Sequence, residues 1–259
     1  MLSANDFEEL RELAESAAAQ AGRLLVAHRA HLSDAEMEIG HDIKIRGDKA
    51  AEALISRLLR KGSSYSIYGE ESGLIGPAGG DLVWVVDPLD GTANYARGVP
   101  ACCVSIALCL HGVSVLGVVY DFNRDEMFSG VEVGAIGLRS ASMNGQGMRV
   151  SDTSSAGNAI LATGFPVASD FESEALSDYV LAVQDFRKVR SLGTAALMVA
   201  YVACGRFDAY TERNVRFWDI VAGIALVRAA GGQVVETSAE PGFDRRLQLN
   251  AWNGLFDFA

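Results

Sequence analysis

The N-terminal part of the chain carries apolar side chains at helical spacing. From Phe7 to Leu24 they return every three or four positions on one face, which predicts an amphipathic helix. A second helix is expected from about Asp48 to Lys61, and Gly62 after it is a residue type that commonly ends helices. Both helices are expected to pack their apolar face against a core.

Further along, the pattern changes to short apolar runs of the kind that form strands. The expected strands lie at residues 65–68, 82–86, 101–110, 113–121 and, less clearly, 126–139. From Gly98 to Tyr120 the chain has no Asp, Glu, Lys or Arg, which is long enough to suggest a membrane span. Pro100, His111 and Gly112 interrupt that stretch, so we expect two buried strands joined by a tight turn and no membrane segment.

After residue 157 the expected strands alternate with helices, a rhythm typical of parallel pairing. Strands are expected at 159–162, 187–190, 207–210, 234–235 and 247–250. Helices are expected at about 171–184, from about 193 onward, and at about 218–230. The fold class is therefore α+β combined with α/β. An antiparallel lobe is expected over residues 1–150, and a lobe with a mostly parallel sheet over residues 151–259.

The composition is that of a folded globular chain, because 49% of the 259 residues are hydrophobic and 21% are charged. The formal net charge of -11 leaves no basic patch for phosphate backbones and argues against a nucleic-acid binder. The four cysteines form no Cys-x-x-Cys pair and are expected to be buried small hydrophobes. An acidic N-terminal segment has the wrong charge for a signal peptide, so we expect a reduced, cytoplasmic protein.

The most informative acidic residues follow apolar runs. Asp87 and Asp90 come directly after the run at 82–86, and Gly91 and Thr92 follow them. Carboxylates are ligands that Mg²⁺ prefers, and backbone N–H groups at the start of a helix suit phosphate. The same residue types also form ordinary turns, so this segment alone leaves both interpretations open.

Two more carboxylates lie at comparable places. Glu70 follows the run at 65–68, and Asp219 opens the apolar helix expected at 218–230. Taken singly, the first is explained as a solvated turn and the second as a helix-start residue. Taken together with the acidic pair, and in this order, they resemble the signature of the inositol monophosphatase family of lithium-sensitive phosphatases. The resemblance extends over essentially the whole chain, and its segments are residues 84–95, 191–196, 208–212 and 218–232.

The resemblance implies a layered α-β-α-β-α sandwich and a homodimer. It implies a Mg²⁺-dependent phosphomonoesterase with two or three Mg²⁺ per active site, acting on a small polyol or sugar monophosphate, with inositol 1-phosphate as the default. The implied metal ligands are Glu70, Asp87, the Leu89 carbonyl, Asp90 and Asp219. The residues implied to orient and deprotonate the attacking water are Asp48, Glu70 and Thr92. The implied substrate contacts are Asp90, Gly91, Thr92, Gly193, Thr194, Ala195 and Glu212.

Elementary chemistry supports this mechanism independently. Hydrolysis of a phosphate monoester is extremely slow without a catalyst, and two metal ions about 4 Å apart can clamp the attacking and leaving oxygens. Such a mechanism needs no nucleophilic side chain. The chain has no His after residue 111, no Gly-x-Ser-x-Gly motif, and no Gly-x-x-x-x-Gly-Lys-Ser/Thr loop of the kind found in NTPases.

One segment departs from the family pattern. Between Asp42 and Asp48, Lys44 stands where a Thr is expected. We hypothesise that its ammonium group supplies positive charge to the metal site, where some relatives place a weak third Mg²⁺. The alternative is a surface-loop substitution that has no effect on catalysis.

Other functions remain open. The same chemistry can act on fructose 1,6-bisphosphate, histidinol phosphate or 3′-phosphoadenosine 5′-phosphate. A bisphosphate needs a second basic pocket, and the candidates for it are Arg190, Arg213 and Arg216. A rival from another class is a non-catalytic interaction protein that retains the fold, although such proteins commonly lose a metal ligand and this chain keeps the whole implied set.

Overall fold

The backbone forms two main β-sheets in the computed structural model, which describes residues 2–33, 35–39, 42–164, 177, 179–181, 183–238 and 241–258. Eight strands make the large sheet, in the order β10-β9-β8-β7-β6-β5-β3-β4. Their bounds are β3 (Ser66–Gly69), β4 (Gly73–Ile75), β5 (Leu82–Asp90), β6 (Cys103–Leu110), β7 (Val113–Asp121), β8 (Glu126–Val133), β9 (Leu138–Met143) and β10 (Gln146–Gly147). Neighbouring strands are antiparallel, as expected, except that β3 and β5 run parallel.

The small sheet has five strands in the order β12-β11-β13-β15-β14. Their bounds are β11 (Ile160–Thr163), β12 (Lys188–Arg190), β13 (Ala209–Arg216), β14 (Gln233–Thr237) and β15 (Arg246–Trp252). β11 pairs in parallel with β12 and β13, whereas β15 pairs antiparallel with β13 and β14. The sheet is therefore mixed rather than mostly parallel, because β15 follows β14 after a short connection and such neighbours pair antiparallel.

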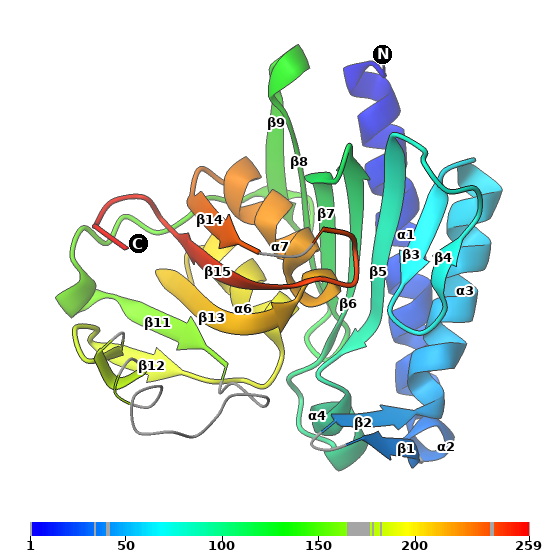
Figure 1. The fold of residues 1–259 in the computed structure, drawn as a ribbon, viewed down its shortest axis with the longest axis horizontal. Coiled ribbons are helices and arrows are strands. Elements are labelled where there is room, and N and C mark those ends of the chain that lie inside the picture. The colour runs from blue at the N-terminus through cyan, green and yellow to red at the C-terminus, as the bar shows by residue number, and fades with distance from the viewer. Residues whose placement is uncertain are drawn as a thin grey trace.

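Helices form layers around these sheets (Figure 1). Their bounds are α1 (Ala4–Ala27), α2 (Arg29–Leu32), α3 (Arg46–Gly62), α4 (Thr92–Arg97), α6 (Ala195–Ala203) and α7 (Phe217–Ala229). α1 and α3 pack on one face of the large sheet, while α6 and α7 lie between the two sheets. This layered arrangement confirms the fold class. The outer helix expected at 171–184 lies largely outside the described residues, and the division into lobes at residue 150 stays a prediction.

Local signals explain where α1 begins and what it buries. The Asp6 N–H donates to Ser3 Oγ at 3.3 Å, and the Ser3 N–H donates to the Asp6 carboxylate at 2.7 Å, which completes a capping box. The buried face of the helix comprises Phe7, Leu10, Ala14, Ala17, Ala18, Ala21, Gly22 and Leu25. The helical periodicity of the sequence is thus confirmed. A two-stranded hairpin of β1 (Ala35–Ile39) and β2 (Asp42–Ile45) precedes α3 and was not expected.

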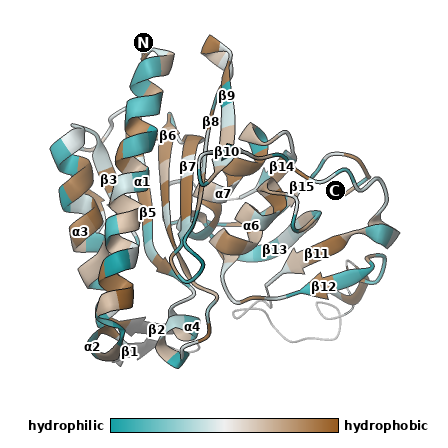
Figure 2. Cartoon of the chain, turned by 180° about the vertical axis from the view of Figure 1, so that it is seen from behind, coloured by the Kyte–Doolittle hydropathy of each residue, from teal (hydrophilic) through white to brown (hydrophobic). Residues whose placement is uncertain are grey.

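The long uncharged stretch forms β6 and β7, two neighbouring strands at the centre of the large sheet. Figure 2 shows both strands as largely hydrophobic, and nearly all of their residues are buried between α1 on one face and α7 on the other. His111 and Gly112 form the turn, with φ values of 50° and 79°. The expected pair of buried strands is confirmed. In the described part of the chain, no helix is long and apolar enough to span a membrane.

Candidate metal and phosphate site

β5 carries three of the expected site residues, Asp87, Leu89 and Asp90, to its C-terminal end, where Gly91 leads into α4. The interpretation of residues 87–90 as a turn is corrected, because β5 continues to Asp90. The register of β5 with β6 shifts between Asp87, opposite Ser105, and Asp90, opposite Cys103. A bulge of this kind re-aims side chains without ending the strand. The strand therefore delivers both carboxylates itself.

Glu70 and Asp219 reach the same region from other elements. Because β3 runs parallel to β5, Gly69 lies opposite Val86, and the N–H of Glu70 donates to the Val86 carbonyl at 3.0 Å. The parallel pairing thus places Glu70 beside the C-terminal end of β5. Asp219 comes from the first turn of α7, between the two sheets.

The electrostatics link these acidic groups to one another. Burial raises the pKa of Asp87 well above its ordinary value, and the charges of Glu70, Asp90 and Asp219 raise it further. Burial likewise raises the pKa of Asp219, with added contributions from the charges of Asp90 and Glu70. Burial raises the pKa of Asp90 to about 6, although a hydrogen bond from Thr194 acts in the opposite direction. The structure therefore brings the four expected carboxylates together.

This donor set suits a hard divalent cation. Several carboxylates in one buried region carry excess negative charge, which a bound Mg²⁺ relieves. In the described part of the chain, no group of three or more His, Cys, Asp or Glu side chains is placed so that it could hold a metal ion. Asp90 Oδ2 accepts Thr194 Oγ1–H at 2.5 Å and the Ala196 N–H at 2.7 Å. The expected ligands, the Leu89 carbonyl included, lie in one region, and their role in metal binding stays a prediction.

The pair expected to orient water is assembled beside them. Asp48 extends from the first turn of α3 and is 3% exposed. Thr92 Oγ1, at the start of α4, lies 3.2 Å from Asp48 Oδ1 and 3.0 Å from the Leu89 carbonyl. Gly91 links β5 to α4 with a φ of 85°, and a Cβ added there would lie 2.8 Å from the Ala101 carbonyl. Only glycine fits this junction.

The expected substrate contacts come from the side of the small sheet. Glu212 lies on β13, and burial raises its pKa. Its charge also raises the pKa of Asp219, so the two carboxylates are close. The three remaining contacts stand at the N-terminal end of α6: Gly193, Thr194 and Ala195. They face β5 through the bond from Thr194 to Asp90. The structure therefore gathers all the expected site residues around the C-terminal end of β5. They come from elements of both sheets and from the helices beside them.

Sequence reasoning missed Glu52, which is 2% exposed on α3. Its Oε2 accepts the Glu71 N–H at 2.8 Å, while its Oε1 is a buried atom without a hydrogen-bond partner. A Cβ added to Gly69 would lie 2.4 Å from this carboxylate. Glu52 thus holds the turn that contains Glu70. Its position one helical turn after Asp48, on the same face, was the available signal.

Some expectations at the edges of the site stay open. Asp42 and Lys44 belong to β2, and their side chains fall outside the described part of the structure, so the Lys44 hypothesis stays a prediction. Arg190 donates to the Val189 carbonyl, and Arg216 donates to the Asp244 carbonyl and lies over the Trp218 ring. These contacts concern two of the three candidate arginines, and the prediction of a second basic pocket stays open.

Two sheets pack on either side of α6 and α7, and carboxylates gather at the end of β5 beside the start of α4, which defines a layered α-β protein with an acidic site. A model of the inositol monophosphatase family matches residues 6–255. The chain belongs to the inositol monophosphatase family.

Individual relatives agree with this assignment. An inositol-1-monophosphatase from Synechocystis is 37% identical over 204 residues, which cover 77% of this chain and 69% of the relative. A protein named Nus factor SuhB from Pasteurella multocida is 40% identical over 195 residues, 73% of this chain and 70% of the relative. The crystal structure of extragenic suppressor protein suhB from Bartonella henselae has a TM-score of 0.83 at 33% identity, covering 95% of this chain and 94% of that one. An inositol monophosphatase structure from Anabaena has a TM-score of 0.78 at 35% identity, covering 96% and 92%.

Proposed function

We propose that this phosphatase is a Mg²⁺-dependent phosphomonoesterase that hydrolyses a small polyol or sugar monophosphate, with inositol monophosphate as the default substrate. The observation that carries the proposal is the convergence of Glu70, Asp87, Asp90 and Asp219 beside the Asp48–Thr92 pair, with Asp87 buried and the other three partly buried. Carboxylates from three separate elements converge there, where burial makes their charge costly without a counter-ion.

The residues proposed to hold Mg²⁺ are Glu70, Asp87, the Leu89 carbonyl, Asp90 and Asp219. When bound, Mg²⁺ lowers the pKa of coordinated water and stabilises negative charge on phosphoryl and leaving oxygens. A basic phosphate grip is unnecessary in that case. This explains how a chain with a net charge of -11 would accept an anionic substrate.

The chain's own residues have distinct proposed tasks. Thr92 and Asp48, with help from Glu70, orient the attacking water; its proton would pass to Thr92 Oγ1 while the hydroxyl proton of Thr92 passes to Asp48 Oδ1, 3.2 Å away. The N–H groups of Gly91 and Thr92 bind phosphate oxygens at the start of α4. Glu212 accepts hydrogen bonds from hydroxyl groups of the substrate alcohol. The segment Gly193–Ala195 contacts that alcohol from the other side.

The direct test is phosphate release from a panel of phosphomonoesters with and without Mg²⁺. We expect turnover with Mg²⁺, no turnover in chelator, and a loss of at least about a hundredfold in Asp87→Asn. Asp152→Asn is the matched control, because the Asp152 side chain is 79% exposed and pairs with Arg149 at the surface. Activity that survives chelation contradicts the proposal. A wild-type chain that hydrolyses no phosphomonoester favours the non-catalytic interaction protein instead.

The panel also decides the substrate. We propose inositol 1-phosphate first, consistent with the name of the Synechocystis relative. Fructose 1,6-bisphosphate, histidinol phosphate and 3′-phosphoadenosine 5′-phosphate are the alternatives with the same chemistry. The bisphosphate in the panel tests whether Arg190, Arg213 and Arg216 serve a second phosphate.

Partners and location complete the proposal. Several relatives are named Nus factor SuhB, which makes nucleic-acid binding worth testing. We propose that this chain does not bind nucleic acid itself, because its net charge is -11, and a gel-shift assay at low salt tests this directly. We further propose a lithium-sensitive, cytoplasmic homodimer, which sedimentation and lithium titration of activity would test.

A further inference from the structure

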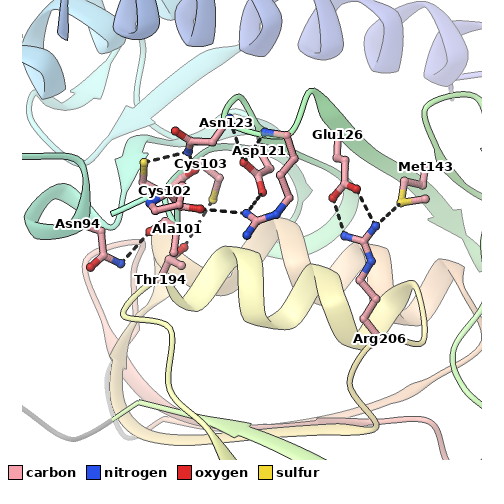
Figure 3. Close-up of polar contacts among 12 residues, drawn as sticks. Asn94, Ala101, Cys102, Cys103, Asp121, Asn123, Glu126, Met143, Thr194 and Arg206 are labelled. Atoms are coloured by element: carbon pink, nitrogen blue, oxygen red, sulfur yellow. Dashed lines mark hydrogen bonds and ion pairs between the residues drawn. The ribbon is translucent and has the colours of Figure 1, made fainter. Parts of the chain in front are cut away.

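One side chain on α4 joins the two sides of the proposed site. Asn94 lies two residues after Thr92, and its Nδ2 donates to the Ala101 carbonyl at 2.7 Å and to the Leu192 carbonyl at 2.7 Å. The Gly193 carbonyl lies 3.3 Å from the same nitrogen. Figure 3 shows Asn94 pointing toward Ala101, next to Thr194 at the start of α6. Asn94 thus connects the segment entering β6 to the segment entering α6.

The surroundings of Asn94 require a hydrogen-bond donor. Carbonyl oxygens from two separate segments converge on one nitrogen, and an amide N–H₂ group has two protons to give them. The backbone also approaches closely here. Gly193 has a φ of 70°, and a Cβ added to it would lie 3.2 Å from Asn94 Nδ2. The glycine and the asparagine therefore form a matched contact.

A second connection between the same segments runs through Asp90. It accepts the Thr194 hydroxyl at 2.5 Å and the Ala196 N–H at 2.7 Å. Asp90 is also a proposed metal ligand, so its oxygens are shared between α6 and the cation. The Asn94 side chain is not a proposed metal ligand, and the hydrogen bonds that its Nδ2 donates all go to backbone carbonyls. Its connection is therefore independent of metal binding.

We propose that Asn94 is a positioning residue that fixes the substrate-contact segment Gly193–Ala195 against the phosphate-binding turn Gly91–Thr92. The proposal rests on the proposed function, since it concerns how that site holds its substrate. Asn94 acts through the backbone of the segment, not on the reacting atoms. Its loss consequently weakens the grip on the substrate alcohol and raises KM, while kcat and Mg²⁺ affinity change little.

Asn94→Leu tests the proposal, because leucine keeps a similar branched shape but has no donor and no charge. The matched control is Asn123→Leu. Asn123 is the same residue type beside the same segment, yet it contacts Cys102 and Arg29, on the large-sheet side (Figure 3 shows the Cys102 contact). Three quantities are measured for each variant: KM and kcat with inositol 1-phosphate, Mg²⁺ affinity by calorimetry, and amide hydrogen exchange of residues 191–198.

We expect KM to rise about five- to tenfold in Asn94→Leu, with kcat and Mg²⁺ affinity within about twofold and faster exchange at residues 191–198. Asn123→Leu leaves KM and that exchange unchanged. Unchanged exchange in Asn94→Leu shows that Asp90 alone holds the segment and overturns the proposal. Faster exchange with an unchanged KM limits Asn94 to a structural role and also overturns it. If the wild type hydrolyses no substrate, the proposed function fails, and the exchange data alone then decide whether Asn94 holds the segment.

Discussion

Arg206 and Glu126 form the best-defined ion pair near α6. The guanidinium follows the C-terminal end of α6 and donates Nη2 to Glu126 Oε1 on β8 at 2.7 Å, with a second contact from Nη1 (Figure 3). It also lies 4.9 Å from the centre of the Tyr201 ring. The hydrogen bond from Arg206 lowers the pKa of Glu126 below its ordinary value. Two-point geometry makes such a pair stronger than an average surface contact.

The pair predicts a pH-dependent contribution to stability. A carboxyl group with a lowered folded-state pKa stabilises the fold above its ordinary pKa of 4.5, and this stability is lost as the pH falls through the folded value. We expect Glu126→Gln to lower the free energy of unfolding by about 0.5–1 kcal/mol at pH 7, measured by urea titration, because the pair is partly exposed. The difference should shrink below pH 4.5. A difference that stays constant with pH contradicts this account, and Asp152→Asn should show no difference at either pH.

At the residue scale, the sequence indicated which acidic residues lie together better than it indicated their contacts. Asp87 and Asp90 were noticed because they follow an apolar run, and Asp219 was added by the family resemblance. Glu52 and Asn94 were missed, because each looks like an ordinary polar residue on a helix. Their roles depend on backbone groups distant in sequence, the Glu71 N–H and the Leu192 carbonyl, which no local pattern reveals.

At the scale of elements, β7 and α7 pack backbone against backbone. A Cβ added to Gly117 would lie 2.1 Å from the Ala222 carbonyl, which is backbone and cannot give way. Ser114, on the same strand, donates its hydroxyl to the Val221 carbonyl at 2.7 Å. The two contacts fix the distance between α7 and the large sheet, and so they fix the position of Asp219 at the start of α7.

Gly117→Ala should therefore destabilise the protein, because either the strand or the helix must move. We expect the free energy of unfolding to fall by about 1–3 kcal/mol in urea titration. Gly157→Ala is the control, since a Cβ added there meets nothing within 4 Å. If both variants lose the same amount, glycine flexibility in the unfolded chain explains the effect, and the close approach does not.

Elements were predictable where the apolar pattern was long and strong. α1 follows a helical period, whereas β6 and β7 are continuous apolar runs separated by His111 and Gly112, and the sequence placed all three within a few residues. The continuation of β5 through residues 87–90 was not predictable, because a bulge and a turn draw on the same residue types. The mixed order of the small sheet depends on which strands pair in space, and a single strand's pattern carries no such information.

At the scale of the whole molecule, the site exists only because two sheets pack around α6 and α7. Asp87 and Glu70 come from the large sheet, whereas Asp219 and Glu212 come from the helix between the sheets and from the small sheet. Folding therefore forces like charges together in a buried place, which costs free energy. The same cost becomes a source of stability when a cation binds, because a ligand that binds only the folded state stabilises it.

Because the carboxylates repel one another without a cation and bind one when it is present, the effect of Asp219→Asn on thermal stability should depend on metal. In chelator, Asp219→Asn should raise Tm above wild type, since it removes one of the repelling charges near Asp87 and Asp90. With Mg²⁺ at about a hundred times its dissociation constant, wild type should gain roughly 5–10 °C, whereas the variant should gain less than half of that. Calorimetry of both proteins, with Asp152→Asn as a surface control, measures the four values. If Asp219→Asn is less stable in chelator and keeps the full Mg²⁺ shift, Asp219 serves packing alone, and the ion is held by other residues.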